Sequence, residues 1–171
     1  MKKRKVTVEA YDPAWQNAFE KISREVRAGM GDRILSVEHV GSTSVPGLAA
    51  KPIIDLDVVI PDEADLEAVI RAMEALGYEH EGDLGIPGRE AFRYDGKEHL
   101  MKHHLYVCRE SSGELFRHIT FRNYLREHPE AAQEYGSVKQ EGAALYPESI
   151  DGYISHKDGC IRRIYEKCGL N

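Results

Sequence analysis

The sequence predicts one mixed α/β domain (α+β) spanning residues 1–171, with a mixed sheet flanked by helices and a helical C-terminal part. Its length of 171 residues suits a single domain. Strand-type and helix-type patterns alternate in the first part of the chain, whereas helical patterns alone follow from about residue 113. No internal repeat, low-complexity tract or Ser/Gly-rich linker divides the two parts.

The N-terminal third is predicted to hold a helix and two strands. Asp12 and Pro13 give a helix start, with an acidic N-cap followed by proline at the first helical position. Apolar residues then recur at helical spacing until Gly29 and Gly31 end the helix. After it we expect a strand at 34–40, an irregular Gly-, Ser- and Pro-rich segment at 41–52, and a β-branched strand at 53–60.

The rest of the chain alternates once more and then becomes helical. A helix is expected to begin at an Asp62 cap and to end at Gly77. Strands are expected near Tyr78, around 91–95 and at 103–108, with a loop at 82–90. Three helices should follow, separated by the prolines at 129 and 147, the last one capped by Ser149.

Charge limits the classes of partner. The 23 Lys and Arg residues against 29 Asp and Glu residues give a net charge of −6. Residues 6–100 carry nine cations and nineteen carboxylates, whereas residues 101–171 carry ten of each. Such a body disfavours binding along a long nucleic acid, which needs a cationic face. The charge distribution is still compatible with binding of a small anionic ligand by a few local cations.

Membrane and disulfide classes are also disfavoured. No apolar run approaches the roughly 18 residues that a membrane span needs. The cationic start at 1–5 lacks the apolar stretch that a signal peptide requires. The cysteines, Cys108, Cys160 and Cys168, include no Cys-x-x-Cys pair. We therefore expect a cytoplasmic protein without a disulfide framework.

Two aspartates in the strand at 53–60 form the candidate chemical motif. The two-residue period of a strand puts Asp55 and Asp57 on one face, about 7 Å apart at Cα, with the apolar residues on the other. Partly buried carboxylates at that spacing need a shared cation or proton. Hard oxygen ligands suit Mg²⁺ or Mn²⁺, commonly together with substrate phosphates. The alternative is a pair of solvent-facing aspartates on an edge strand.

The segment before this strand favours the metal interpretation. Gly41 and Ser42 leave the preceding strand about a dozen residues before Asp55. A glycine there lets the backbone approach a phosphate, and the Ser42 and Ser44 hydroxyls can donate hydrogen bonds to its oxygens. A phosphate cradle would then face the metal carboxylates.

The order hydrophobic-Gly-Ser, then Asp-hydrophobic-Asp-hydrophobic, resembles the nucleotidyltransferase (polymerase beta-like) superfamily signature. Longer blocks are similar to the GrpB (UPF0157) family over nearly the whole chain. These blocks are YDPAW at 11–15, EHVGSTSVPGLAAKPIIDLDV at 38–58, LGIPGREAFRY at 84–94, HHLYV at 103–107 and FRNYLREHPEAAQEYGSVK at 121–139. The resemblance implies a nucleotidyltransferase fold, occurring alone or fused to dephospho-CoA kinase, without fixing a reaction.

Carried over from the superfamily, the roles fall on four residues. Asp55 and Asp57 would bind divalent metal, and Gly41 and Ser42 would hold a triphosphate. The third carboxylate that a later strand usually supplies is missing, since residues 103–107 contain no Asp or Glu. His104 shares the predicted site face with Tyr106, so His104 is a candidate metal ligand or base. A packed, structural histidine is the alternative.

Several cations interrupt otherwise apolar helical stripes in the C-terminal part. They are Arg122, Lys139 and Lys157. Snorkelling of their long stems to water is one interpretation, and a shared anion site is the other. Lys51, beside the aspartate strand, and Arg89 and Arg93, in and after the 82–90 loop, are further candidates for phosphate contact.

The sequence thus favours a metal-dependent nucleotidyltransferase-like protein. It would bind a nucleoside triphosphate, or another small phosphate ligand, with its acceptor unidentified. One alternative is a non-catalytic nucleotide- or phosphate-binding module, consistent with the missing carboxylate. Another is a metal-dependent hydrolase using His104, His103 or His39 beside the aspartates, and the last is a purely structural or chaperone-accessory role.

Overall fold

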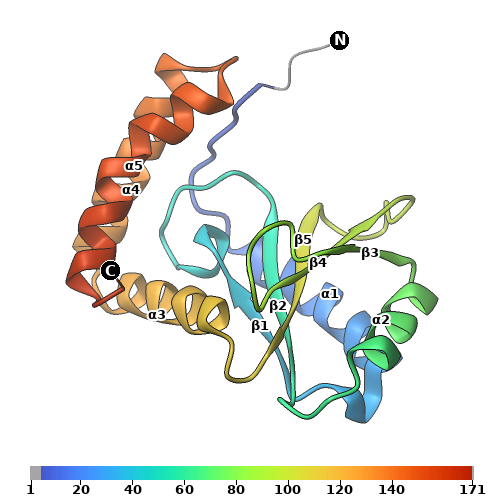
Figure 1. Ribbon diagram of the computed structural model, residues 1–171. Helices are drawn as coiled ribbons and strands as arrows, with labels where there is room; N and C mark the ends of the chain where they lie inside the picture. The colour runs from blue at the N-terminus through green and yellow to red at the C-terminus, as the bar shows by residue number, and fades with distance from the viewer. Residues whose placement is uncertain (1–4, 171) are drawn as a thin grey trace.

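A five-stranded mixed sheet lies at the centre of the molecule (Figure 1). The structure is a computed structural model that describes residues 5–170, so most of the cationic start lies outside the described residues. The strands run in the order β1-β2-β5-β4-β3, with β2 and β5 parallel and every other neighbouring pair antiparallel. Their bounds are Ser36–Val40 (β1), Ile54–Ile60 (β2), Tyr78–Gly82 (β3), Glu90–Tyr94 (β4) and His103–Arg109 (β5).

Helices α1 and α2 cover one face of the sheet, and α3 lies over part of the other. The main core joins α1 and α2 to the inward side chains of β2 and β5, such as Leu56 and Leu105. On the opposite face, Leu115 of α3 packs against Val59 and Cys108. The helices are Ala14–Met30 (α1), Leu66–Ala75 (α2), Gly113–Glu127 (α3), Pro129–Leu145 (α4) and Ile150–Lys167 (α5).

The last two helices form an antiparallel pair to one side of the sheet (Figure 1). A second core holds the pair against α3 and against the segment that follows β1. This core includes Val45 and Leu48 of that segment, Leu125 of α3, Tyr135 of α4 and Ile164 of α5. The segment between β1 and β2 is therefore clamped between the sheet and the C-terminal helices, which fixes its place beside the aspartates of β2.

The predicted elements are all present, with shifts at two helix starts. The side chain of Asp65, and not that of Asp62, caps α2 by accepting a hydrogen bond from the Ala68 amide at 3.3 Å. Asp62 instead accepts hydrogen bonds from the amide and hydroxyl of Ser111. Helix α1 begins one residue later than expected, with Pro13 at the N-cap position. The cap of α5 by Ser149 is confirmed.

Two further facts concern the helices and the cysteines of the described residues. None of the helices at 5–170 has the length and apolar character needed to cross a membrane. Cys108, Cys160 and Cys168 are all free thiols.

Candidate functional site

The turn after β1 brings the backbone against the Asp55 side chain. Gly41 has φ +72° and ψ −176°, a backbone region that is essentially restricted to glycine. A Cβ at this position would overlap Oδ2 of Asp55. A short 3₁₀ helix, Ser42–Ser44, follows, and the Ser44 amide donates to the Gly41 carbonyl at 3.1 Å. Glycine is thus required both by the conformation and by the contact.

This contact gives a testable consequence for Gly41→Ala. The backbone strain alone is expected to lower the free energy of unfolding by about 1 to 3 kcal/mol. Displacement of Asp55 should add to that loss. Gly47→Ala is the matched control, because Gly47 also has a positive φ of 82° but a Cβ added there would meet no atom within 4 Å. Urea unfolding of both variants measures the difference, and equal losses would argue against the contact with Asp55.

Asp55 and Asp57 lie on the same face of β2, as predicted, but in different environments. The Asp55 side chain is 33% exposed, whereas Asp57 is fully buried. His104 Nδ1 lies 3.1 Å from Asp55 Oδ1, and His118 Nδ1 lies 2.6 Å from Asp57 Oδ2. Each carboxylate therefore has its own imidazole partner, one from β5 and one from α3.

Burial is the largest single influence on the pKa of Asp57 and on that of His118. It raises the pKa of Asp57, although the hydrogen bond and charge of His118 oppose that shift. Burial lowers the pKa of His118, but the hydrogen bond and charge of Asp57, with the charge of Glu114, outweigh burial, so the net shift is upward. The second oxygen of Asp57, Oδ1, is buried and has no hydrogen-bond partner.

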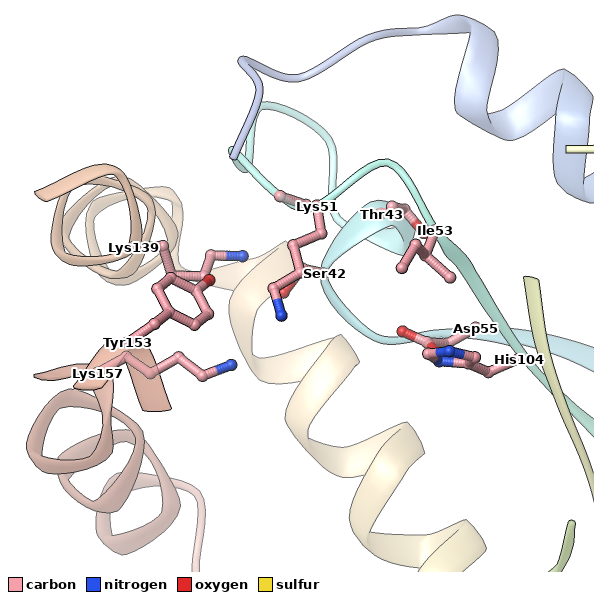
Figure 2. A pocket seen from close by; sticks show the side chains of 10 residues that line it. Ser42, Thr43, Lys51, Ile53, Asp55, His104, Lys139, Tyr153 and Lys157 are labelled. Carbon is pink, nitrogen blue, oxygen red and sulfur yellow. The ribbon is translucent and has the colours of Figure 1, made fainter. Parts of the chain in front are cut away.

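Three lysines face Asp55 across a cavity of about 200 Å³, which we call the lysine pocket. Figure 2 shows the ammonium groups of Lys51, Lys139 and Lys157 on the side of the pocket that faces Asp55 and His104. The lysines come from the segment before β2, from α4 and from α5 respectively. The lining residues are Ser42, Thr43, Ala50, Lys51, Ile53, Asp55, His104, Lys139, Tyr153 and Lys157.

The three lysines lie against aromatic rings, and Lys139 is also buried. Lys51 and Lys157 place Nζ 4.8 and 4.9 Å from the Tyr153 ring centroid. Lys139 is 2% exposed, with Nζ 4.5 Å from the Tyr135 centroid. Burial, with the neighbouring Lys157 and Lys51 charges, lowers the pKa of Lys139 to about 7. Burial also lowers the pKa values of Lys51 and Lys157. Such a cluster of cations favours an anion.

The remaining predicted phosphate contacts are not brought into this pocket. Arg122 donates to Glu38 Oε2 at 2.9 Å and to the His39 carbonyl at 3.0 Å, so it ties α3 to β1. Arg93 forms an exposed ion pair with Glu79. In both cases a carboxylate of the protein already pairs with the guanidinium, and neither side chain lines the lysine pocket.

Ser44 and Arg89 also have local partners. The Ser44 hydroxyl donates to the Gly41 carbonyl, so it supports the turn and does not face the lysine pocket. Arg89 lies over the Tyr106 ring at 4.3 Å, on the Asp57 side of the sheet, and its Nε is buried without a hydrogen-bond partner. The fold thus gathers five of the predicted anion-contacting residues around Asp55, namely Gly41, Ser42, Lys51, Lys139 and Lys157.

Two of the three histidines considered for a hydrolase lie on the wrong face of the sheet. His39 bonds Thr43 at 2.9 Å and stacks on Phe19, and His103 accepts from the Tyr78 hydroxyl at 2.7 Å. Both are buried in the direction of α1 and α2, because their strand positions alternate with those of the site residues. Of the three, His104 alone contacts one of the two aspartates, Asp55.

His118 and Tyr153 are site residues that sequence reasoning missed. His118 lies four residues after Glu114, so both share one helical face, but that spacing alone does not say which strand the face will cover. Tyr153 falls on an apolar stripe in the sequence, and its ring is buried as that stripe indicates. The ammonium groups of Lys51 and Lys157 also lie against this ring.

The donor set fits a divalent ion shared with a ligand. Within residues 5–170, no group of three or more His, Cys, Asp or Glu side chains is arranged to hold a metal. Mg²⁺ does not need such a group, since one or two carboxylates, waters and substrate phosphates commonly complete its shell. Asp57, on the same face of β2 as Asp55, has one buried carboxylate oxygen, Oδ1, without a hydrogen-bond partner.

Comparison with known proteins shows the family and the fold. A family model described as GrpB protein matches residues 5–167. UPF0157 protein YqkA of Bacillus subtilis is 36% identical over 96% of this chain, which spans only 47% of YqkA. The crystal structure of GrpB from Enterococcus faecalis has a TM-score of 0.81 at 38% identity, covering 95% of this chain and 96% of that one.

A more distant likeness concerns the fold alone. The Cid1 poly(U) polymerase, solved with MgGTP bound, has a TM-score of 0.51 at 13% identity, covering 76% of this chain and 42% of Cid1. The mixed sheet and its helices therefore have a nucleotidyltransferase-like fold, and the chain belongs to the GrpB family.

Proposed function

We propose that the protein binds a nucleoside triphosphate together with Mg²⁺ or Mn²⁺ and transfers its nucleotidyl group to a small acceptor. The observation that carries this proposal is the lysine pocket, in which three ammonium groups from three separate segments face Asp55 across one cavity. Three partly desolvated cations repel one another unless an anion of several charges lies between them. A triphosphate has that charge.

Each residue has a defined part in this function. Lys51, Lys139 and Lys157 would bind the outer phosphates, and Ser42 would donate a hydrogen bond from the turn. Asp55 and Asp57 would hold the divalent ion. When bound, that ion neutralises charge at the α-phosphate and on the departing pyrophosphate. His104 and His118 fix the orientation of the two carboxylates. Rate enhancement would come mainly from positioning and electrostatics.

The fold gives further support. Cid1, which shares the fold, has been solved with MgGTP and with MgATP bound. The corresponding complex here would place phosphates between the Gly41–Ser42 turn and the lysines, with the reacting α-phosphate beside the aspartates.

A thermal-shift titration with ATP, GTP, CTP and UTP, each with and without Mg²⁺, tests this function. A specific ligand at one hundred times its dissociation constant should stabilise the protein by about 2.7 kcal/mol. The double variant Asp55→Asn with Asp57→Asn should lose the Mg²⁺-dependent part of the shift. Asp32→Asn, an exposed aspartate outside the site, is the matched control. No shift in the native protein, or an equal shift in the double variant, would contradict the proposal.

A second candidate function is phosphate binding without catalysis. It is favoured by the site face of β5, where Tyr106 lies opposite Asp57 and no carboxylate completes a two-metal site. This function predicts the same nucleotide binding but no pyrophosphate release with any acceptor. A coupled pyrophosphate assay on protein already shown to bind nucleotide separates the two functions.

A further inference from the structure

A second cavity of about 250 Å³ opens beside the lysine pocket. One face of α3 forms its wall through Glu114, Arg117, His118 and Phe121, which follow the i, i+3, i+4, i+7 spacing of a helical stripe. Tyr165 of α5 and Tyr135 of α4 close it. We call this space the aromatic pocket.

The two pockets share Ser42 and Asp55. A ligand whose phosphates contact the lysines can therefore extend past Asp55 and place its other end in the aromatic pocket. In a nucleoside triphosphate, the α-phosphate lies between the outer phosphates and the nucleoside. The shared residues thus lie where the reacting phosphate of the proposed function belongs.

Aromatic rings and a guanidinium group line the aromatic pocket and pack against one another. Phe121 and Tyr165 have ring centroids 5.3 Å apart at 66°, and Phe121 and Tyr135 have centroids 6.0 Å apart at 88°. The Arg117 guanidinium lies 4.9 Å from the Tyr165 centroid. Aromatic faces and a guanidinium plane are the surfaces on which nucleobases stack in proteins.

Glu114 supplies the polar edge of this pocket. Its side chain is 27% exposed, and its carboxylate lies 3.9 Å from Arg117 Nε and 3.7 Å from His118 Nε2. Both separations exceed hydrogen-bond distance, so the carboxylate oxygens keep their accepting capacity.

A carboxylate discriminates among bases by the donors that it meets. Guanine presents a ring N–H and an exocyclic amino group side by side, which matches two carboxylate oxygens. Adenine and cytosine each present one donor next to a ring nitrogen acceptor, and uracil presents one donor between two carbonyl acceptors. An acceptor facing a carboxylate is left unpaired and repelled.

We propose that the aromatic pocket is the nucleobase subsite and that Glu114 selects guanine. This inference rests on the proposed function, because it assumes that a nucleoside triphosphate occupies the lysine pocket. It names the substrate class as a guanine nucleotide.

Calorimetric titration with GTP, ATP, CTP, UTP and inorganic tripolyphosphate, all with Mg²⁺, tests the inference. The native protein should bind GTP about tenfold more tightly than any other nucleotide, as a bidentate pair to a base edge supports. Glu114→Gln should reduce that preference to about threefold or less. Affinity for tripolyphosphate, which has no base, should stay unchanged.

Two further variants keep the result interpretable. Glu130→Gln makes the same change at an exposed glutamate in the first turn of α4, and it should retain the GTP preference. Phe121→Leu should weaken the binding of all four nucleotides without weakening the binding of tripolyphosphate.

Equal affinities for the four nucleotides in the native protein, a preference for another base, or a GTP preference that survives Glu114→Gln would each overturn guanine selection. Those results leave the proposed function standing. Failure of every nucleotide and of tripolyphosphate to bind would instead overturn the proposed function itself.

Discussion

Lys139→Met is expected to make the protein more stable while abolishing its tight binding of polyphosphate. Lys139 is 2% exposed, and burial together with Lys157 and Lys51 lowers its pKa from 10.5 to about 7, with Asp55 opposing the shift. Each pKa unit corresponds to about 1.4 kcal/mol, so the shift represents roughly 4 to 5 kcal/mol. Allowing for water in the open pocket, we expect a gain of about 2 to 4 kcal/mol at pH 7.

The pH dependence of this gain follows from the direction of the shift. Between about pH 7 and 10.5, the unfolded chain holds the Lys139 proton more strongly than the folded chain does. Stability of the native protein should therefore rise with pH across this window, relative to Lys139→Met. The advantage of the variant should be largest below pH 7 and should vanish near pH 10.5.

Urea unfolding at several pH values, combined with tripolyphosphate titration, measures both effects. Lys167→Met, at an exposed lysine of α5, is the matched control and should change stability by no more than about 0.5 kcal/mol. A Lys139→Met protein that is less stable than the native protein at pH 7, or that binds tripolyphosphate normally, would show that Lys139 is a structural residue.

His118→Ala is expected to lower the free energy of unfolding by about 3 to 5 kcal/mol, the usual result of removing one partner from a buried pair. It would leave the fully buried Asp57 without a hydrogen bond on either oxygen, because Oδ1 already has none. Adding Asp57→Asn should recover part of the loss, since the amide carries no charge.

The His80–Glu90 pair provides a control for this result. Its hydrogen bond is also short, at 2.7 Å, but Glu90 keeps a side-chain exposure of 24%. His80→Ala should therefore lower the free energy of unfolding by only about 1 kcal/mol. Urea unfolding at pH 7 measures the free energy of unfolding of both single variants. Equal losses would indicate that the burial of Asp57 is not the reason why the stability of the protein depends on His118.

The sequence predicts those parts of the site that depend on local geometry. The alternation of the strand around Asp55 and Asp57 gives their shared face, and Gly41 marks the turn that approaches them. Lys139 and Lys157 are detectable because each interrupts an apolar helical stripe. A lysine on an apolar stripe has few routes to water, because the stripe faces the protein interior. Its ammonium group therefore points into the neighbouring cavity.

The missed features depend on contacts between distant segments. Arg122 interrupts a stripe just as Lys139 does, but it meets Glu38 of β1, a neighbour that helical periodicity does not reveal. His118 reaches Asp57 only because α3 crosses the sheet at that point. The shift of the α2 cap from Asp62 to Asp65 has a similar origin, since Ser111 engages Asp62.

The parallel pairing of β2 with β5 also sets when the site assembles during folding. Asp55 and His104 are 49 residues apart in the chain, and Asp57 and His118 are 61 apart. Helix α2 and the β3–β4 hairpin lie between β2 and β5 and make local contacts with low loop-closure entropy. We therefore expect the carboxylates to stay unpaired until this intervening unit has folded and β5 has joined the sheet. Their solvation by water in the early chain keeps that waiting state free of buried charge.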